Sequence, residues 1–595
     1  ASQKGLIENF DSHVGRTSVL MPLGGKHLKT PALASVQTLP VLHGTTNTVS
    51  LATWGYSTAI ANQNPFLMGT YAVVESLSKL VASGGDYKKA RLSFQEYFER
   101  LGGDAEKWGK PLQALLGALE AQLEFETAAI GGKDSMSGTF ENISVPPTLI
   151  SFACAVGELK DIISPELKST ENKLYLFEHK PVAEGIPNYK LLREGYAKIH
   201  ELIKEGKIMS AQTIKEGGLA CSLFKMSVGN GLGAEINYAT DVFKPQIGSL
   251  ILESTEELEG FTLLGKVRET GLRINGESFD IKELTQAWEG TLESIFPSKT
   301  KEGTNDEGLQ IKLASELVES QVSSLKSKVL LPRVFIPVFP GTNCEYETEQ
   351  VFEQAGAEVR TALFTNQTEQ QIEQSIVAFE KEINAANIMM IPGGFSAGDE
   401  PDGSAKFIVA VLKNPRIKEA VHALLKRGGL MLGICNGFQA LVKSGLLPYG
   451  EIRDLDDTSA TMTFNSIGRH ISQTAHIQVV SDKSPWLRGM KGEKFIIPFS
   501  HGEGRFYASD EMVDELAANG QIATQYIDEE GNVALDMPHN PNGSVHGIEG
   551  ITDASGQIYG RMGHPERYRN GLMKNIPEMA FMDIFKNGVE WFSKD

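Results

Sequence analysis

Short apolar runs alternate with helical stretches along the last third of the chain. The runs typical of buried strands are Arg333–Phe339, Val359–Phe364, Ile388–Ile391 and Leu430–Ile434. The stretches with helical periodicity are Glu345–Ala357, Glu369–Ala385 and Ala405–Lys426, the last interrupted at Pro415. This strand–helix rhythm predicts a parallel sheet with helices on both faces. Ligands bind beyond the carboxyl ends of the strands in such a sheet.

The first half of the chain is patterned differently. Its clearest helical and strand-like runs are Gly69–Ala82, Leu112–Glu126, Thr148–Val156 and Lys173–Phe177. Because these helices and strands are less regularly interleaved, we expect an α+β fold there. A polar stretch at 297–308 predicts a linker, and a short helix at about 312–325 follows it.

We therefore expect a multidomain protein with four segments. Residues 1–165 and 166–296 form two subdomains of the α+β half, divided by a change of pattern near 165–172. Residues 297–331 form the linker, and residues 332–595 form an α/β doubly wound domain. A chain of 595 residues suits this division, because single cores rarely grow beyond about 300 residues.

Composition and charge narrow the class of function. Hydrophobic residues make up 41% of the chain and charged residues 22%, which is ordinary for a soluble protein. The net charge of −19 argues against a nucleic-acid or membrane partner, and no run of 18 apolar residues is present. The four cysteines are widely spaced without a Cys-x-x-Cys pair, which suits a reducing cytoplasm and gives no zinc signature.

The run 430–439 contains the most informative residue, Cys435. Three apolar residues lead into Gly-x-Cys-x-Gly, and a helical pattern follows. This order predicts a strand that turns sharply into a helix, with Gly433 and Gly437 allowing the tight turn. A thiol at that apex lies at a helix N-terminus, which favours the thiolate, and the next backbone N–H points at an oxyanion formed there.

A thiol nucleophile needs a base, and His564 is the first candidate. It follows an extended stretch at 557–562, and in extended backbone residues i and i+2 point to the same side. Glu566 would therefore lie beside His564 and orient its ring. His501 is the rival base, because Glu503 stands two residues after it in the same way.

A strand that ends in a Gly-Gly turn supplies a third part. The apolar run Ile388–Ile391 is followed by Pro392, Gly393 and Gly394. Such a turn presents backbone N–H groups without side-chain obstruction, as an oxyanion hole requires.

These motifs together resemble a class I glutamine amidotransferase domain. Their residue pattern is similar to that of the formylglycinamide ribonucleotide amidotransferase family, the phosphoribosylformylglycinamidine synthases. Five motifs match in order: Pro340–Glu345, Pro392–Asp399, Gly433–Gln439, Ser500–Arg505 and His564–Arg567. The resemblance covers about 332–595.

The resemblance implies a role for each matching residue. Cys435 would be the nucleophile, His564 the base and Glu566 its partner. Backbone N–H groups of Asn436 and of Gly394 or Phe395 would bind the oxyanion. The residues implied at the oxyanion or at bound glutamine are Gly393, Gly394, Phe395, Asn436, Gln439 and His501.

The first half carries a glycine-rich loop at Ile130–Gly138. Within nine residues it holds Lys133, Asp134 and the hydroxyls of Ser135 and Ser137. Such a loop offers N–H groups and a lysine to phosphate oxygens, while its carboxylate holds Mg²⁺. The spacing is not that of a Walker A motif, and a polar surface turn is the alternative.

This loop resembles the aminoimidazole ribonucleotide synthetase-like ATP-binding superfamily, which implies ATP and Mg²⁺ as cofactors. The residues implied at the nucleotide are Lys133, Asp134, Ser135 and Ser137, and those at the metal are Asp134 and Glu75. Three positions depart from the superfamily's pattern: His43, Lys79 and Gln212. Because a lost or reversed charge weakens a metal site, we expect the metal constellation of this half to be altered.

The two resemblances together imply an amide ligase with cysteine-dependent glutaminase activity. It would use glutamine and ATP to amidate formylglycinamide ribonucleotide in purine biosynthesis. Only the second of two synthetase halves is recognisable, so an N-terminal portion of the same enzyme is the expected partner. Two alternatives stay open: a stand-alone cysteine hydrolase, and a glutaminase regulated by a non-catalytic nucleotide-binding scaffold.

Overall fold

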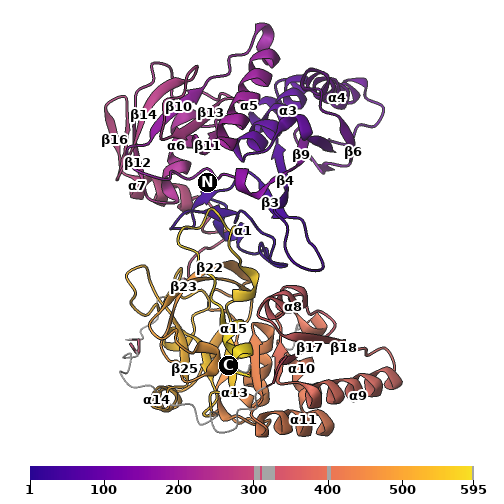
Figure 1. Ribbon diagram of the computed structural model, residues 1–595. Coiled ribbons are helices and arrows are strands. Elements are labelled where there is room, and N and C mark those ends of the chain that lie inside the picture. The colour runs from indigo at the N-terminus through magenta and orange to yellow at the C-terminus, as the bar shows by residue number, and fades with distance from the viewer. Residues whose placement is uncertain (301–307, 311–328, 399–403, 593–595) are drawn as a thin grey trace.

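The computed structural model describes residues 1–300, 308–310, 329–398 and 404–592. Two lobes meet at a waist, with the first half of the chain in one lobe and the second half in the other (Figure 1). The predicted helix at 312–325 lies outside the described residues, as does most of the predicted linker. Nothing in the structure fixes the four segment boundaries, which stay predictions. In the described ranges no helix is both long enough and apolar enough to cross a bilayer.

A five-stranded sheet and a pair of long helices form the first part of the α+β half. The strand order is β3 (Ser35–Thr38), β4 (Thr48–Gly55), β9 (Thr148–Glu158), β5 (Arg91–Tyr97) and β6 (Ala129–Lys133). The helices are α1 (Lys4–Ile7), α2 (Thr58–Ala61), α3 (Pro65–Ala82) and α4 (Ala105–Phe125). Helix α3 is buried along most of its length, because it packs against both the sheet and α4. Two short pairs, β1 (Leu23–Gly24) with β2 (Thr30–Pro31) and β7 (Thr139–Phe140) with β8 (Ile143–Ser144), lie outside this sheet.

A seven-stranded sheet forms the second part of that half. Its order is β11 (Ile208–Thr213), β13 (Leu250–Ser254), β10 (Lys173–Phe177), β14 (Thr262–Arg268), β12 (Gly233–Ile236), β15 (Leu272–Ile274) and β16 (Glu277–Phe279). Its helices are α5 (Tyr189–Lys204), α6 (Gly218–Val228) and α7 (Ile281–Gly290). Neighbouring strands are mostly antiparallel, as an α+β fold requires.

The second half of the chain is built on a nine-stranded sheet. The five parallel strands, in order, are β18 (Glu358–Leu363), β17 (Arg333–Val338), β19 (Ile388–Ile391), β20 (Leu430–Ile434) and β27 (Ile558–Arg561). Four antiparallel strands extend it: β26 (Ile548–Thr552), β25 (Ile522–Tyr526), β22 (Ile471–Val479) and β23 (Lys494–His501). A small pair, β21 (Thr461–Thr463) and β24 (Arg505–Tyr507), stands apart.

The helices of the second half follow the predicted order. They are α8 (Glu345–Gln354), α9 (Glu369–Ala385), α10 (Lys406–Leu412), α11 (Pro415–Lys426), α12 (Asn436–Ser444), α13 (Leu446–Tyr449), α14 (Asp510–Ala518) and α15 (Ile584–Glu590). The predicted parallel sheet is confirmed, and the predicted break at Pro415 separates α10 from α11. The antiparallel extension was not predicted, because its strands do not alternate regularly with helices; α14 is the α-helix that lies between them in the chain.

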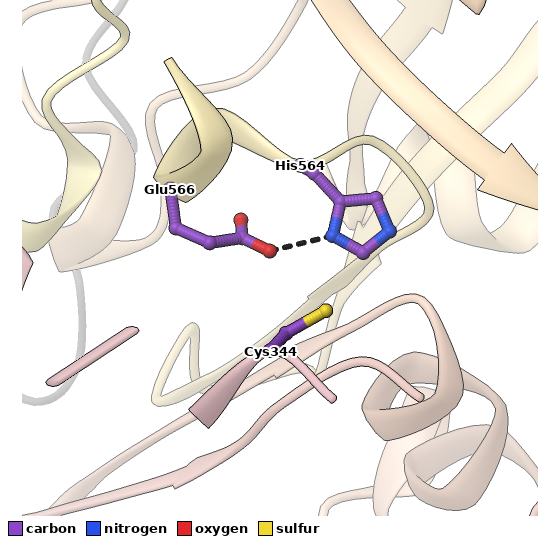
Figure 2. Close-up of side chains that lie close together, drawn as sticks. All are labelled: Cys344, His564 and Glu566. Carbon is purple, nitrogen blue, oxygen red and sulfur yellow. Dashed lines mark hydrogen bonds and ion pairs between the residues drawn. The ribbon is translucent and has the colours of Figure 1, made fainter. Parts of the chain in front are cut away.

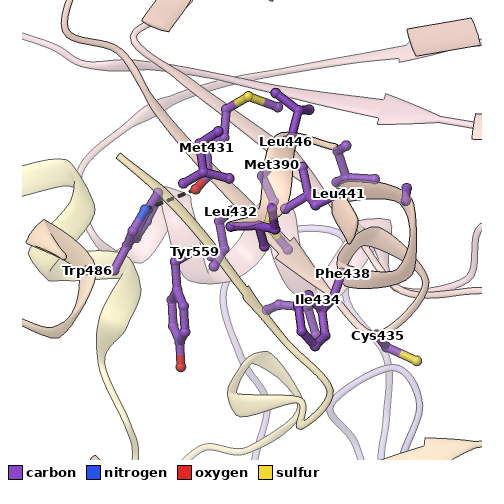
Figure 3. Packing of buried hydrophobic residues seen from close by; sticks show 14 of the residues in the cluster. Met390, Met431, Leu432, Ile434, Cys435, Phe438, Leu441, Leu446, Trp486 and Tyr559 are labelled. Atoms are coloured by element: carbon purple, nitrogen blue, oxygen red, sulfur yellow. Dashed lines mark hydrogen bonds between the residues drawn. The ribbon is translucent and has the colours of Figure 1, made fainter. Parts of the chain in front are cut away.

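The apolar residues of strand β20 explain why this strand lies at the centre of the sheet. Met431, Leu432 and Ile434 are fully buried, and Cys435 emerges at the end of their row (Figure 3). Trp486 packs on the same strand and donates from its indole N–H to the Met431 carbonyl at 3.1 Å. A strand buried on both faces reads as a continuous apolar run, which is the pattern at 430–434.

The two halves share part of their cores. A segment near the C-terminus, residues 568–579, runs back against the first half, and its Tyr568, Met573 and Ile576 join the first half's apolar core. Backbone bonds fasten it there, from Met573 N–H to the Ser18 carbonyl at 3.0 Å and from Lys574 N–H to the Val19 carbonyl at 2.8 Å.

Candidate active site

Cys435 occupies the turn between β20 and α12. Its backbone has φ of 52° and ψ of −107°, a strained conformation that persists only where its surroundings enforce it. Gly437 permits α12 to pack closely against the end of β19, because a Cβ there would lie 1.9 Å from the carbonyl oxygen of Ile391. The predicted elbow is thus present, with the thiol carried at the first residue before the helix.

His564 and Glu566 form the second part of the site. Glu566 Oε1 lies 2.5 Å from His564 Nδ1, and both side chains are fully buried (Figure 2). An ionised carboxylate only accepts, so Nδ1 carries the proton and Nε2 has a free lone pair. Nε2 makes no hydrogen bond to any described residue. A base requires this tautomer.

His564 and Glu566 pair as predicted, but the backbone conformation that brings them together is not the extended one that was predicted. Strand β27 ends at Arg561, and residues 565–567 form a turn of 3₁₀-helix. The two side chains therefore meet across a tight turn, and extended backbone is not what aligns them.

The predicted nucleophile and the predicted base converge at Gly393. A Cβ at this glycine would lie 2.7 Å from His564 Cε1, 3.0 Å from Cys344 Sγ and 3.4 Å from Cys435 Cβ. Only a residue without a side chain fits between these groups. The Cys435 thiol itself donates to the Ser500 carbonyl at 3.6 Å.

Burial sets the protonation states of the site. It raises the pKa of the Cys435 thiol to about 12, although the Arg567 charge and a hydrogen bond from the Asn436 backbone N–H lower it. Burial likewise holds the pKa of His564 well below its usual value. The resting pair is therefore a neutral thiol and a neutral imidazole, whereas the helix N-terminus alone had favoured a thiolate.

The backbone groups predicted for the oxyanion differ in availability. Phe395 N–H donates to the Gly341 carbonyl at 2.9 Å, so it is already engaged. Gly394 has φ of 150°, a conformation that side chains rarely adopt. Asn436 begins α12 directly after the nucleophile. The arrangement favours Gly394 over Phe395 as the partner of Asn436.

His501 is buried near the site but lacks the orientation of a base. Its Nδ1 lies 3.1 Å from the Asn465 side-chain oxygen, and Glu503 instead pairs with Lys443 at 2.6 Å. Gln439 donates to the Glu503 carbonyl and accepts from the Asn436 amide at 2.9 Å. The carboxylate that made His501 a rival is thus directed elsewhere.

Sequence reasoning missed Cys344 and Arg567. Cys344 Sγ, His564 and Glu566 bring one ligand atom each within 4.8 Å of one another, the only such group among the described residues (Figure 2). Arg567 Nη2 donates to Cys344 Sγ at 3.0 Å. Both residues lie in motifs already noted, but only the fold shows that they touch the base and its partner.

Residues from the far end of the chain also reach this cluster. Asp11 pairs with Arg567 at 3.0 Å, and His13 Nδ1 lies 2.9 Å from Arg567 Nη1. Burial lowers the pKa of His13 to about 3, so its neutral ring accepts from Arg567 and donates from Nε2 to the Phe499 carbonyl at 3.1 Å. The first half thus contacts the residue next to Glu566.

The predicted nucleotide loop lies at the edge of the five-stranded sheet. Lys133 ends β6, and Lys133, Asp134 and Ser137 are exposed, while Ser135 is half-buried. The hydroxyls of Ser135 and Ser137 lie 3.0 Å apart. An exposed loop with a lysine and two hydroxyls is open to a phosphate, and the predicted roles stay predictions.

The two predicted metal ligands have different surroundings. Beside Asp134, Glu96 is buried, and neither of its carboxylate oxygens has a hydrogen-bond partner within the described ranges. Burial and the Asp134 charge raise the pKa of Glu96 to about 7. An orphaned carboxylate beside a second one fits a cation such as Mg²⁺.

Glu75 does not fit such an ion. Its Oε1 lies 2.7 Å from Lys79 Nζ and 3.0 Å from Lys215 Nζ, and its Oε2 accepts from the Tyr56 backbone N–H at 3.1 Å. Two ammonium groups already neutralise this carboxylate. The altered constellation expected from Lys79 is therefore visible as an ion pair.

The comparisons with known proteins agree with this geometry. Residues 331–592 match the family model of the CobB/CobQ-like glutamine amidotransferase domain. The chain is 34% identical over 285 residues to phosphoribosylformylglycinamidine synthase subunit PurQ of Methanococcus maripaludis. The aligned region covers 44% of this chain and 99% of that protein. It is 34% identical over 259 residues to the same subunit of Dehalococcoides mccartyi, with 42% and 94% covered.

Solved structures give weaker likenesses. The structure of PurLQS from Thermotoga maritima has a TM-score of 0.32 at 24% identity, covering 44% of this chain and 100% of that chain. T. maritima PurL complexed with ATP has a TM-score of 0.32 at 18% identity, covering 42% and 39%.

The doubly wound sheet, the cysteine elbow and the matched family model define an amidotransferase of the glutamine-using class. Its relatives identify it further. The chain belongs to the phosphoribosylformylglycinamidine synthase family.

Proposed function

We propose that this chain takes part in the glutamine-dependent, ATP-driven amidation of formylglycinamide ribonucleotide in purine biosynthesis. Membership of the family supports the reaction, and the convergence of Cys435 and His564 at Gly393 supports the glutaminase step. The second half would release ammonia from glutamine, and the first half would take part in its use.

The glutaminase step follows from the tautomer of His564. As Cys435 Sγ attacks the side-chain amide carbon of glutamine, His564 Nε2 takes the thiol proton. The amide oxygen gains the charge and is held by the backbone N–H groups of Asn436 and Gly394. His564 then gives its proton to the departing ammonia, and water hydrolyses the thioester to glutamate.

Glu566 supports both proton transfers. Its carboxylate holds Nδ1–H and stabilises the imidazolium that forms when Nε2 takes the proton. Because the resting thiol is neutral, proton removal and carbon–sulfur bond formation belong to the same step.

ATP and Mg²⁺ are the proposed cofactors of the first half. ATP supplies the phosphoryl group that activates the amide oxygen of the ribonucleotide for displacement by ammonia. Lys133 and the hydroxyls of Ser135 and Ser137 would bind phosphate, and Asp134 with Glu96 would hold the cation.

Replacement of the nucleophile tests the proposal. Cys435→Ala is expected to abolish release of glutamate from glutamine, since no other group can form the thioester. Ammonia-dependent formation of the amidine by the complete enzyme should continue, because that step does not use the thiol. Cys154→Ala is the matched control, as Cys154 is an exposed cysteine of the first half. Loss of the ammonia-dependent reaction as well would contradict separate sites for the two steps.

A regulatory role for the first half is the second candidate. The Glu75–Lys79 ion pair favours it, because that carboxylate is not open to a metal. Equilibrium binding of ATP to the purified chain, with and without the expected N-terminal portion, separates the two when it is combined with ammonia-dependent turnover of the complete enzyme. Binding of ATP to the chain without turnover by the complete enzyme would favour a scaffold.

A further inference from the structure

A cationic pocket lies where the N-terminal segment, strand β4 and helices α3, α6 and α7 meet. Its volume is about 260 Å³. Three lysines line it, Lys79, Lys215 and Lys225, together with the indoles of Trp54 and Trp288. No aspartate or glutamate lines it in the described part of the chain. The protein as a whole has a net charge of −19, so the three positive charges of this pocket contrast with the rest of the molecule.

Lys79 is the most deeply buried of the three lysines that line this pocket. The residue is only 5% exposed, which is unusual for a lysine. Its Nζ donates to the Trp54 carbonyl at 2.8 Å, pairs with Glu75 and lies 3.7 Å from the centre of the Trp54 ring. These contacts fix the ammonium group in position.

Lys215 and Lys225 add two further charges. Lys215 Nζ shares the Glu75 carboxylate with Lys79 and lies 5.3 Å from the Trp54 ring centre. Lys225 stands on α6, half-buried, and its ammonium group has no hydrogen-bond or ion-pair partner in the described chain. The Glu75 carboxylate therefore pairs with two of the three lysines that line the pocket.

The charge surplus affects Lys79 directly. Burial lowers its pKa to about 8; Glu75 opposes this shift, and the charges of Lys215 and Lys225 add to it. An anion entering the pocket would relieve that repulsion, because it would lie among all three ammonium groups.

We propose that this pocket binds a phosphate-type anion, such as pyrophosphate or a small phosphate ester, through its lysines and without a divalent cation. A divalent cation needs carboxylate or carbonyl oxygens, and the one nearby carboxylate is already neutralised. The fixed ammonium of Lys79 supplies positive charge in its place. The volume suits a small anion, since pockets for larger organic ligands are typically about 300–1,000 Å³. The proposal does not depend on the glutaminase site.

Calorimetric titration of the full chain with inorganic pyrophosphate tests it. In EDTA we expect one site, with affinity that falls as salt rises. Lys225→Gln should weaken binding about tenfold or more, since a charge-assisted hydrogen bond is lost, and Lys225→Arg should retain it. Lys88→Gln is the matched control, because Lys88 is exposed on another part of the lobe.

Lys225 is half-buried and carries a free charge, so its replacement leaves the buried Glu75–Lys79 pair intact. Thermal unfolding of each variant verifies that the fold is kept. Three results would overturn the proposal: no binding in EDTA, binding that appears only with Mg²⁺, or equal affinities of wild type and Lys225→Gln.

Discussion

Two opposing influences act on the thiol of Cys435. Burial raises its pKa to about 12, while Arg567 and the Asn436 N–H stabilise the charged form. Burial is the larger effect, so the thiol holds its proton at neutral pH. A neutral thiol reacts little with electrophiles, because the thiolate is the reactive form.

The His564–Glu566 pair predicts the pH dependence of glutamine hydrolysis. Burial raises the pKa of Glu566 to about 7, against the lowering effect of Arg567, so the pair takes up one proton below about pH 7. The protonated pair cannot accept the thiol proton, and kcat/KM should therefore rise with pH and level off above about 7. Initial rates of glutamate release between pH 5 and 9 measure this.

Glu566→Gln provides the control for that profile. The amide cannot ionise, so the rise near pH 7 should disappear while kcat falls by about 100- to 10,000-fold, as loss of a triad carboxylate does elsewhere. If the variant kept the wild-type pH profile, the titrating group would lie outside the pair.

At the scale of elements, the site depends on the ends of three neighbouring strands, which approach one another closely. Strand β19 delivers Gly393, β20 delivers Cys435 and the turn after β27 delivers His564. All three lie at the carboxyl ends of neighbouring parallel strands, where open α/β sheets bind ligands.

Gly393→Ala should disable the site while leaving the sheet in place. The added methyl group would lie 2.7 Å from His564 Cε1, so the ring must move. We expect a fall of about 100-fold or more in kcat for glutamine hydrolysis, and a loss of about 1–3 kcal/mol in unfolding free energy. Steady-state kinetics and chemical denaturation measure the two effects.

Gly109→Ala is the matched control for that substitution. Gly109 lies inside helix α4, and a Cβ there meets nothing within 4 Å. It should stabilise the chain by roughly 0.5–1 kcal/mol and leave glutamine hydrolysis unchanged. An equal loss of activity in both variants would show that the effect of Gly393→Ala is not local.

At the scale of the whole molecule, the two halves meet beside the proposed catalytic cluster of Cys435, His564 and Glu566. Arg567 follows Glu566 in the chain, and its guanidinium donates to Asp11 and His13 of the first half. Arg16 extends the contact by donating to the Tyr568 carbonyl at 3.2 Å. A change in the first half can therefore reach the base of the second through direct hydrogen bonds.

His13→Ala tests this connection. Arg567 would lose one buried acceptor, and its shifted charge would disturb Glu566 and His564, so kcat for glutamine hydrolysis should fall by about tenfold with little change in KM. His13→Asn keeps an acceptor and should restore much of the rate. Lys26→Gln is the control at the same interface, since Lys26 forms an exposed ion pair with Glu529 at 3.1 Å.

If His13→Ala and His13→Asn lowered kcat equally, Arg567 would not be the route of the effect. A fall in thermal stability without any change in kcat would give His13 a structural role alone.

The amino-acid sequence by itself determined the main strands and helices of the second half and the elbow that carries the Cys435 thiol. Apolar runs of the right length specify β19 and β20, and the glycines at 433 and 437 predict a tight turn at Cys435 from the local sequence alone. Such features depend on neighbours in the chain, so local patterns reveal them.

Only the tertiary structure decided which groups meet. His564 and His501 share the same local pattern, and only the fold shows that His564 pairs with the carboxylate two residues later while His501 contacts Asn465 instead. The protonation of Cys435 depends on how deeply it is buried, and the link from Asp11 to Arg567 spans the whole chain. Contacts between distant residues, and the desolvation that burial imposes, belong to the folded molecule and leave no local trace in the sequence.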